Sequence, residues 1–86
     1  MIKKNSIAGS LESSDILVEL FVHDNGRIIE LDSPVKQQFG DEIIQVVTEI
    51  LDEEKIDNVK VILRDAGALN YTIKARLKTA IQRGRE

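Results

Sequence analysis

The 86-residue chain contains no cysteine and no tryptophan, and it has one histidine, one proline, one tyrosine and two phenylalanines. The absence of cysteine excludes a disulfide framework and any metal site built from thiolates. A nucleophilic serine would need a base that is itself oriented by a third group, and His23 is the only histidine available. We therefore expect no catalytic residues and no metal ligands, so the chain is not expected to be an enzyme on its own.

The chain also lacks a long hydrophobic run. No apolar stretch approaches the roughly 20 residues that span a bilayer. Lys3 and Lys4 are followed by polar residues rather than by the apolar segment of a targeting signal. The composition, 42% hydrophobic and 31% charged, is that of an ordinary globular domain. We expect a single domain over residues 1–86, located in the cytoplasm and without a membrane partner.

The net charge of −3 is unevenly distributed. Residues 71–86 carry five cations and one carboxylate, whereas residues 1–70 carry 7 basic and 14 acidic side chains. A basic segment can bind nucleic acid, but the chain has few aromatic residues for base stacking and an acidic remainder. Cations near the end of a helix are also favoured by the helix dipole. We therefore expect no nucleic-acid partner, and we keep a non-catalytic interaction or RNA-binding domain as the contrasting hypothesis.

Alternating apolar and polar residues predict several strands. The pattern is strongest in residues 15–24 and recurs in 59–64, and residues 6–12 form a weaker candidate. The dipeptide Asn25-Gly26 tolerates the positive φ angles of a two-residue turn. It therefore predicts a hairpin between the strong strand and residues 27–31.

Two helices are predicted from apolar residues at helical spacing. Ser33 is expected to cap the first, with Pro34 at its first position. Gly40-Asp41 interrupts the stripe, which leaves a kink or a second helix start open, and residues 52–57 end the helix. The last helix begins near Leu69 and is expected to stop at Gly84.

These elements predict an α+β fold, a small two-layer sandwich in which two helices cover one face of a mixed sheet of three or four strands. The order is β-β-α-β-α, with a possible extra strand at the N-terminus. The predicted core consists of Val18, Leu20, Phe39, Ile43, Val47, Ile50, Val61, Leu63, Ile73, Leu77 and Ile81.

The segment 9–15 (GSLESSD) is the one part of the chain that suggests covalent chemistry. It is a polar segment with two adjacent serines, set between two predicted strands. A serine in an exposed turn can serve as an attachment point even in a protein without catalytic machinery. Serine is also an ordinary turn residue, so the segment alone does not decide between the two interpretations.

This segment resembles the G-(S/T)-L-E-S-x-D turn of the citrate lyase acyl carrier proteins, the gamma subunits of that complex. Residues 35–41 (VKQQFGD) are similar to the family's V-x-x-Q-F-G-D stretch, and residues 65–69 (DAGAL) to its D-x-G-A-L turn. Ala75-Arg76-Leu77 resembles a helical segment of the R-A-R-L type. The resemblance places the modified serine on Ser13, with Ser14, at a position often occupied by glycine in the family, as the second choice.

The resemblance implies an acyl carrier that bears phosphoribosyl-dephospho-coenzyme A, covalently attached through a phosphodiester. Such a carrier moves acetyl and citryl groups between a transferase (alpha) and a lyase (beta) subunit during cleavage of citrate to acetate and oxaloacetate. Its further partners are a prosthetic-group transferase and an acetylating ligase. Glu12 and Asp15 are expected either to form an acidic patch that these partners recognise or to cap and solubilise the turn. The carrier subunit of malonate decarboxylase is the alternative member of this group, and Leu11-Glu12 favours citrate lyase over it.

Overall fold

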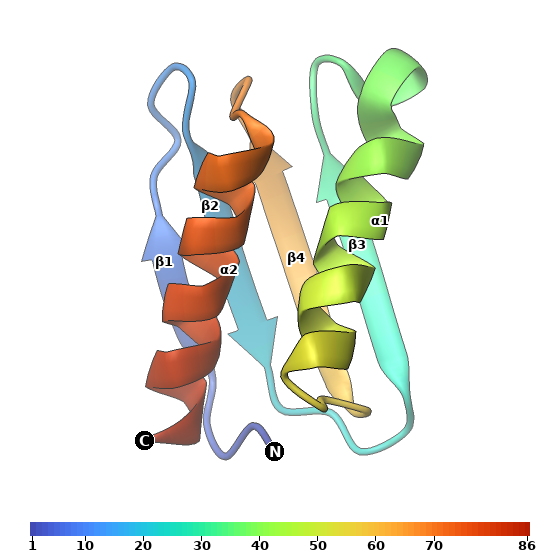
Figure 1. The fold of residues 1–86 in the computed structure, drawn as a ribbon. Helices are drawn as coiled ribbons and strands as arrows, with labels where there is room; N and C mark the ends of the chain where they lie inside the picture. Colours follow the sequence, from blue (N-terminus) through green and yellow to red (C-terminus); the bar gives the residue numbers. More distant parts are fainter.

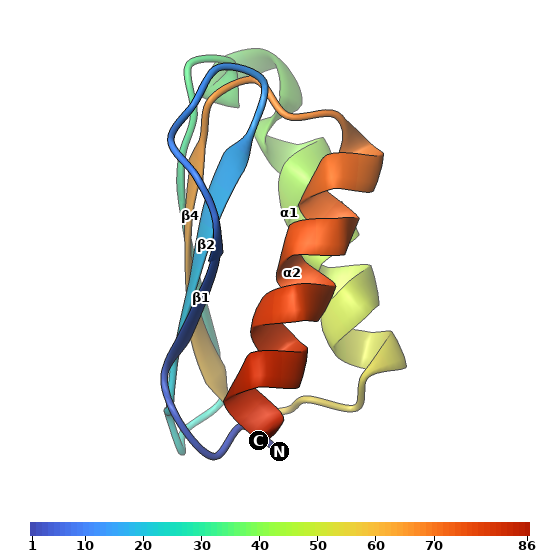
Figure 2. The same ribbon diagram turned by 90° about the vertical axis from the view of Figure 1, so that its left-hand side faces the viewer.

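The computed structural model describes residues 1–86 as one sheet and two helices. The strands are β1 (Ser6–Gly9), β2 (Ile16–Phe21), β3 (Arg27–Asp32) and β4 (Val59–Asp65), and the helices are α1 (Lys36–Glu53) and α2 (Asn70–Arg85). Both helices lie on the same face of the sheet, as the two views in Figures 1 and 2 show. The predicted α+β class is confirmed, and the N-terminal strand is present.

The predicted hairpin at Asn25-Gly26 is wrong, because β2 and β3 do not pair. The sheet order is β1-β2-β4-β3, with β4 antiparallel to β2 and parallel to β3. Residues 22–26 instead cross the end of β4, where the Gly26 N–H donates to the side-chain oxygen of Asn58 at 2.7 Å. Gly26 has the positive φ that the dipeptide indicated, 82°. β4 therefore lies between β2 and β3, and its inward-facing Val59, Val61 and Leu63 are fully buried, as are Ile16, Val18 and Leu20 of β2.

The hydrophobic core fills the space between the sheet and the two helices. Every predicted core residue except Phe39 is buried there, together with Ile2, Ala8, Ile16, Val46, Leu51, Ile56, Val59 and Ala80. Phe39 is 50% exposed, which corrects its assignment to the core. It belongs to the first turn of α1, which lies beyond the end of the strands in Figure 1, so no strand lies beneath it.

The helix boundaries differ from those expected. α1 begins at Lys36, two residues after Pro34, and it runs through Gly40 without a break. α2 continues past Gly84 to Arg85, so Gly84 does not end the helix. The Gly84 carbonyl accepts hydrogen bonds from the N–H groups of Lys3 and Lys4, at 2.8 and 3.2 Å. A Cβ on Gly84 would lie 3.2 Å from the Lys4 carbonyl oxygen, so the glycine allows the N-terminal segment to pass close to the helix.

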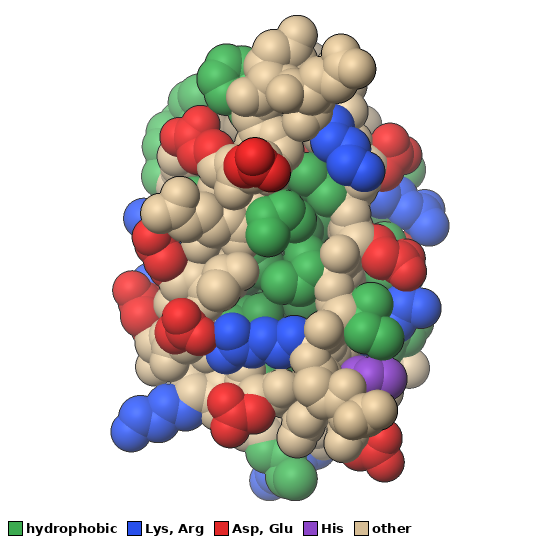
Figure 3. All heavy atoms as spheres, turned by 90° about the vertical axis from the view of Figure 1, so that its right-hand side faces the viewer, with side chains coloured by type: hydrophobic (Ala, Val, Ile, Leu, Met, Phe, Trp, Pro, Cys, Tyr) green, Lys and Arg blue, Asp and Glu red, His purple; other side chains and the backbone are tan.

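The remaining surface is largely polar. Figure 3 shows hydrophobic side chains along the line between α1 and the edge strand β3, with charged side chains on both sides. Ile29 and Leu31 of β3 are partly buried and pack against the core there. Neither helix combines the length and the apolar composition needed to cross a membrane.

Candidate functional site

Residues 10–15 connect β1 to β2 and form a loop beside the segment that follows β4 (Figure 1). Gly9 starts the loop with a φ of 90°, and a Cβ there would lie 1.8 Å from the carbonyl oxygen of Ile16. Only glycine fits both requirements. The Ser10 N–H donates to the same Ile16 carbonyl at 3.2 Å, which keeps the two strands paired up to the loop.

Ser13 and Ser14 occupy the centre of a tight turn. The Asp15 N–H donates to the Glu12 carbonyl at 3.1 Å and closes the turn around the two serines. The Ser14 N–H donates to the Ala66 carbonyl at 2.7 Å, and the Ala66 N–H donates to the Asp15 carbonyl at 2.9 Å. These bonds fasten the turn to the end of β4, so both serines stand on a fixed support.

The serine hydroxyls of the chain fall into two groups. The hydroxyls of Ser6, Ser10 and Ser33 donate to Ala80, Asp15 and Asp65 at 2.6, 2.7 and 2.7 Å. Ser13 and Ser14 are exposed, and neither hydroxyl takes part in a hydrogen bond of the fold. The two candidate residues are therefore the serines whose oxygens are available for chemistry.

Ser14 differs from Ser13 in its backbone. Its φ is 66°, in the left-handed region that glycine tolerates best. The position is thus one where glycine fits as well as serine or better. Ser13 carries no such constraint, because Ser14 and Lys55 are the only residues other than glycine with a positive φ.

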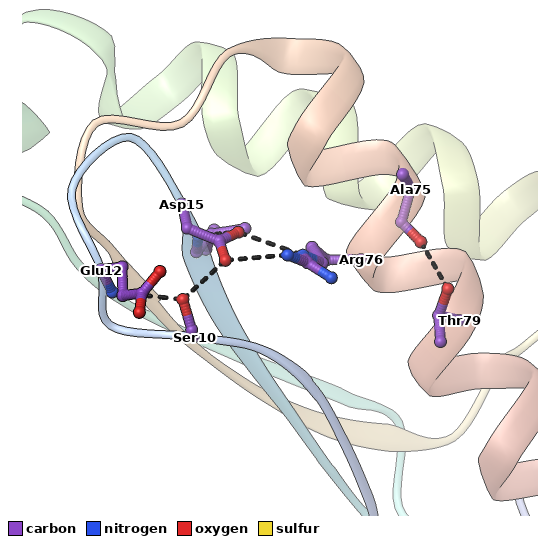
Figure 4. A network of polar contacts seen from close by, with 7 residues as sticks. Ser10, Glu12, Asp15, Ala75, Arg76 and Thr79 are labelled. Carbon is purple, nitrogen blue, oxygen red and sulfur yellow. Dashed lines mark hydrogen bonds and ion pairs between the residues drawn. The ribbon is translucent and has the colours of Figure 1, made fainter.

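The carboxylate of Asp15 holds the loop to α2, as Figure 4 shows. Arg76 donates from Nε and Nη2 to its two oxygens at 3.1 and 2.9 Å. The hydroxyl of Ser10 and the N–H of Ile16 also donate to this carboxylate, each at 2.7 Å. The Arg76 hydrogen bonds, followed by those from Ser10 and Ile16, hold the pKa of Asp15 well below its usual range, and the pair raises the pKa of Arg76.

This network favours a structural role for Asp15, one of the two acidic residues beside the serines. Asp15 is engaged by a cation and two further donors, so it anchors the loop and does not present a free negative charge. Glu12 is exposed and remains the free carboxylate of the turn. Arg76 lies 61 residues away in the chain, and no local pattern in the sequence pointed to its pairing with Asp15.

Asp65 shapes the segment on the other side of the turn. It is buried, and its Oδ1 accepts from the N–H groups of Gly67 and Ala68 at 3.1 and 2.8 Å. Its Oδ2 accepts from the hydroxyl of Ser33 at 2.7 Å. Both oxygens are therefore used within the fold, and Asp65 fixes the 66–69 segment against the start of α1.

Between this segment and α1 lies a pocket of about 430 Å³, which we call the α1–α2 pocket. Its apolar walls come from Val35, Phe39, Ile43, Ala68 and Leu69, and its remaining lining residues are Glu42, Asp65, Gly67 and Asn70. The two sequence blocks 35–41 and 65–69 thus meet in one place. Asn70 donates to Glu42 at 3.2 Å and links the two helices at the pocket.

The basic residues of α2 are mostly engaged within the fold. Arg83 donates to the Ile7 carbonyl at 2.7 Å, Arg85 pairs with Glu54 at 2.6 Å, and Arg76 pairs with Asp15. Only Lys74 and Lys78 on this helix are exposed cations without such a bond. No three histidine, aspartate or glutamate side chains cluster in a way that could hold a metal ion.

Comparison with known proteins identifies relatives over nearly the whole chain. A family model described as ACP, malonate decarboxylase delta subunit (MdcD), matches residues 3–84. The citrate lyase acyl carrier protein of Lactiplantibacillus plantarum is 52% identical, over 99% of this chain and 88% of its own length. The citrate lyase acyl carrier protein of Oenococcus oeni is 48% identical, over 95% and 84%, and that of Treponema denticola is 41% identical, over 99% and 97%.

A solved structure has the same fold. A chain in the crystal structure of a Pseudomonas malonate decarboxylase hetero-tetramer in complex with malonate matches with a TM-score of 0.75. The match covers 94% of this chain and 84% of that chain, with 14% sequence identity. At that identity the likeness concerns the fold alone.

Proposed function

This chain belongs to the family of citrate lyase acyl carrier proteins, and on that premise we propose that Ser13 bears its prosthetic group. The chain is an acyl carrier, a non-catalytic subunit that acts within a larger enzyme. A carrier needs an anchor that is open to solvent yet fixed in position, because the attached group must reach other proteins from a defined point.

The turn around Ser13 supports this assignment. Its hydroxyl is exposed and unbonded, while the backbone on either side is tied to Ala66 through Ser14 and Asp15. Ser14 is the second choice, since its hydroxyl is equally free. Its left-handed backbone supports Ser13 over Ser14, because a position that glycine suits does not depend on a side chain.

We propose that the group is phosphoribosyl-dephospho-coenzyme A, joined to Ser13 by a phosphodiester. When bound, this group supplies a terminal thiol that holds the acyl group as a thioester. Arg76 compensates the charge of Asp15, so Glu12 is the one carboxylate of the turn without a cation partner that an added phosphodiester would face. Because the chain has no cysteine, it adds no competing thiol of its own.

The proposed role is to carry acetyl and citryl groups between the transferase (alpha) and lyase (beta) subunits of citrate lyase, which together convert citrate to acetate and oxaloacetate. Tethering keeps the acyl group at high effective concentration near both active sites. Loading requires a prosthetic-group transferase and an acetylating ligase as further partners. The family resemblance also supports a cytoplasmic location.

The carrier subunit of malonate decarboxylase is the second candidate. The description of the matching family model and the fold of the Pseudomonas structure favour it. The citrate lyase carriers are 40–52% identical to this chain over nearly its full length, whereas the Pseudomonas chain is 14% identical. A separate RNA-binding role has less support, because three of the five α2 cations bind within the fold.

Intact-mass measurement of protein made together with its modifying enzymes tests the proposal. The wild-type chain and Ser14→Ala are expected to gain one adduct of coenzyme A size, whereas Ser13→Ala gains none and stays folded. The loaded protein is then combined with purified citrate lyase subunits, and citrate cleavage is measured. An adduct on Ser13→Ala contradicts the choice of anchor, and loaded protein that fails to support cleavage of citrate favours the malonate enzyme.

A further inference from the structure

We propose that the α1–α2 pocket is the resting site of the neutral pantetheine end of the group carried by Ser13. This inference rests on the proposed function, because it requires the group to be attached there. At about 430 Å³ the pocket falls within the size range of small-molecule sites, which is roughly 300–1,000 Å³.

The position of the pocket is the first observation. The 65–69 segment separates it from the serine turn and contacts both. On one side Ala66 exchanges backbone hydrogen bonds with Ser14 and Asp15, at 2.7 and 2.9 Å. On the other side Gly67, Ala68 and Leu69 line the pocket. A long flexible group anchored on the turn therefore has this pocket as its nearest apolar surface of suitable size.

The exposed side chains of the pocket are the second observation. Phe39 and Leu69 are 50% and 58% exposed, although both are large hydrophobic residues at the pocket. Contact with the methyl and methylene groups of pantetheine would remove apolar surface from water on both partners. Asn70 also lines the pocket, and because its amide N–H donates to Glu42, its carboxamide oxygen is the atom that would accept from the amides of the same group.

The charge of the pocket favours binding of the uncharged pantetheine end over the diphosphate part of the group. Its lining includes two carboxylates, Glu42 and Asp65, and no cation. Phosphates would be repelled there, whereas the pantetheine end carries amides, a hydroxyl and a thiol but no charge. The diphosphate part is thus expected to stay outside, with the thiol end seated between Phe39 and Leu69.

A tethered ligand needs little intrinsic affinity to occupy such a site. With an effective concentration on the order of 1 mM, a site with an intrinsic Kd of about 1 mM is occupied about half of the time. Half-occupancy shields the thiol from reagents while still releasing it to a partner. The pocket would therefore protect the thiol for part of the time without holding it so tightly that a partner could not reach it.

Two measurements on the loaded protein test this. Amide chemical shifts of loaded and unloaded protein are compared, and changes are expected in residues 35–43 and 67–70 as well as in the serine turn. The thiol is then titrated with dithionitrobenzoate, which reports on the attached group alone because the chain contains no cysteine. Loading is verified beforehand by intact mass.

Leu69→Asn is the informative variant. Leu69 precedes α2 in an extended conformation at its N-cap, where asparagine is favoured, so the change removes apolar surface without weakening the helix. The matched control is Tyr71→Asn, which removes an aromatic that is 72% exposed and does not line the pocket. The thiol of Leu69→Asn is expected to react about twofold faster than that of the wild type, and that of Tyr71→Asn at the wild-type rate.

Pocket shifts that are lost in Leu69→Asn but kept in Tyr71→Asn support the proposal. Shifts confined to residues 10–15 and 66, with equal thiol rates in all three proteins, overturn it and leave the proposed function intact. Pocket shifts that arise only when an unloaded carrier meets the lyase subunit also overturn it, because the pocket is then a surface for that partner. Absence of any adduct by mass refutes the proposed function together with this inference.

Discussion

Replacing Ser14 by glycine should stabilise the protein and leave its loading unchanged. Ser14 has a φ of 66°, is exposed, and its hydroxyl makes no hydrogen bond in the fold. Its N–H donates to Ala66 at 2.7 Å, and glycine keeps that donor. The substitution therefore relieves backbone strain without removing a contact.

The magnitude follows from two opposing contributions. In the left-handed conformation a residue with a side chain is strained by about 1–2 kcal/mol, and glycine relieves this strain. Glycine also has more conformational freedom in the unfolded chain, which lowers the stability of the folded state by about 0.5–1 kcal/mol. We expect the free energy of unfolding to rise by roughly 0.5–1 kcal/mol. For a domain of this size that corresponds to an increase in Tm of about 2–8 °C. Urea unfolding followed by circular dichroism measures the first quantity, and a thermal scan measures the second.

Lys55→Gly is the matched control, because Lys55 also has a positive φ, 57°, but lies at the far end of α1. There the N–H of Ile56 donates to Leu51 and that of Lys55 to Asp52, a helix ending in which glycine is preferred. Both variants should gain stability, and both should load. A less stable Ser14→Gly beside a more stable Lys55→Gly would refute the strain argument, and an unloaded Ser14→Gly would move the anchor to Ser14.

Three further changes test the account of the fold and of the turn. Leu63→Ala should lower the free energy of unfolding by about 2–5 kcal/mol, because Leu63 is fully buried on β4; Phe39→Ala should cost clearly less, and equal losses in urea unfolding would contradict the exposure of Phe39. Gly9→Ala should prevent folding, since its Cβ would lie 1.8 Å from a carbonyl oxygen, whereas Gly26→Ala, with open space around it, should still give a dispersed amide spectrum. Asp15→Asn should be less stable than the wild type at pH 7. The pKa of Asp15 is depressed in the folded state, so its stabilisation is complete above the unfolded pKa of about 3.9 and is lost as the pH falls towards the folded value. The deficit of Asp15→Asn should therefore shrink below about pH 4, and a deficit that is unchanged at pH 3 would argue against the ion pair.

The sequence was sufficient for the elements and for most of the core, because strand and helix periodicities are local signals. It was not sufficient for the strand order. Asn25-Gly26 carried a real preference for positive φ, and Gly26 adopts it. The position of β4 between β2 and β3, however, depends on pairing between segments far apart in the chain, which a local turn signal does not report. Phe39 was assigned to the core because its spacing matches the apolar stripe of the helix. The first turn of α1 extends beyond the end of the strands, however, and the sequence does not show where the sheet ends relative to the helix.

The sequence was sufficient to place the candidate site on residues 9–15. It was not sufficient to identify the residues that hold this turn in position. Arg76 and Ala66 hold the turn from positions more than fifty residues away, and no motif linked them to it. The blocks 35–41 and 65–69 were recognised separately, and only the structure brings them together around one pocket. The free or bonded state of each serine hydroxyl likewise depends on tertiary contacts.

Fragmentation of the loaded tryptic peptide identifies the serine that bears the group. Cleavage after Lys4 and Arg27 gives the peptide 5–27, which holds Ser6, Ser10, Ser13 and Ser14. Electron-based fragmentation retains the adduct and locates it on one residue. We expect the whole mass of the group on Ser13. The adduct on Ser14 would contradict the chosen anchor, and its presence on neither residue would contradict the role of this turn as the attachment site.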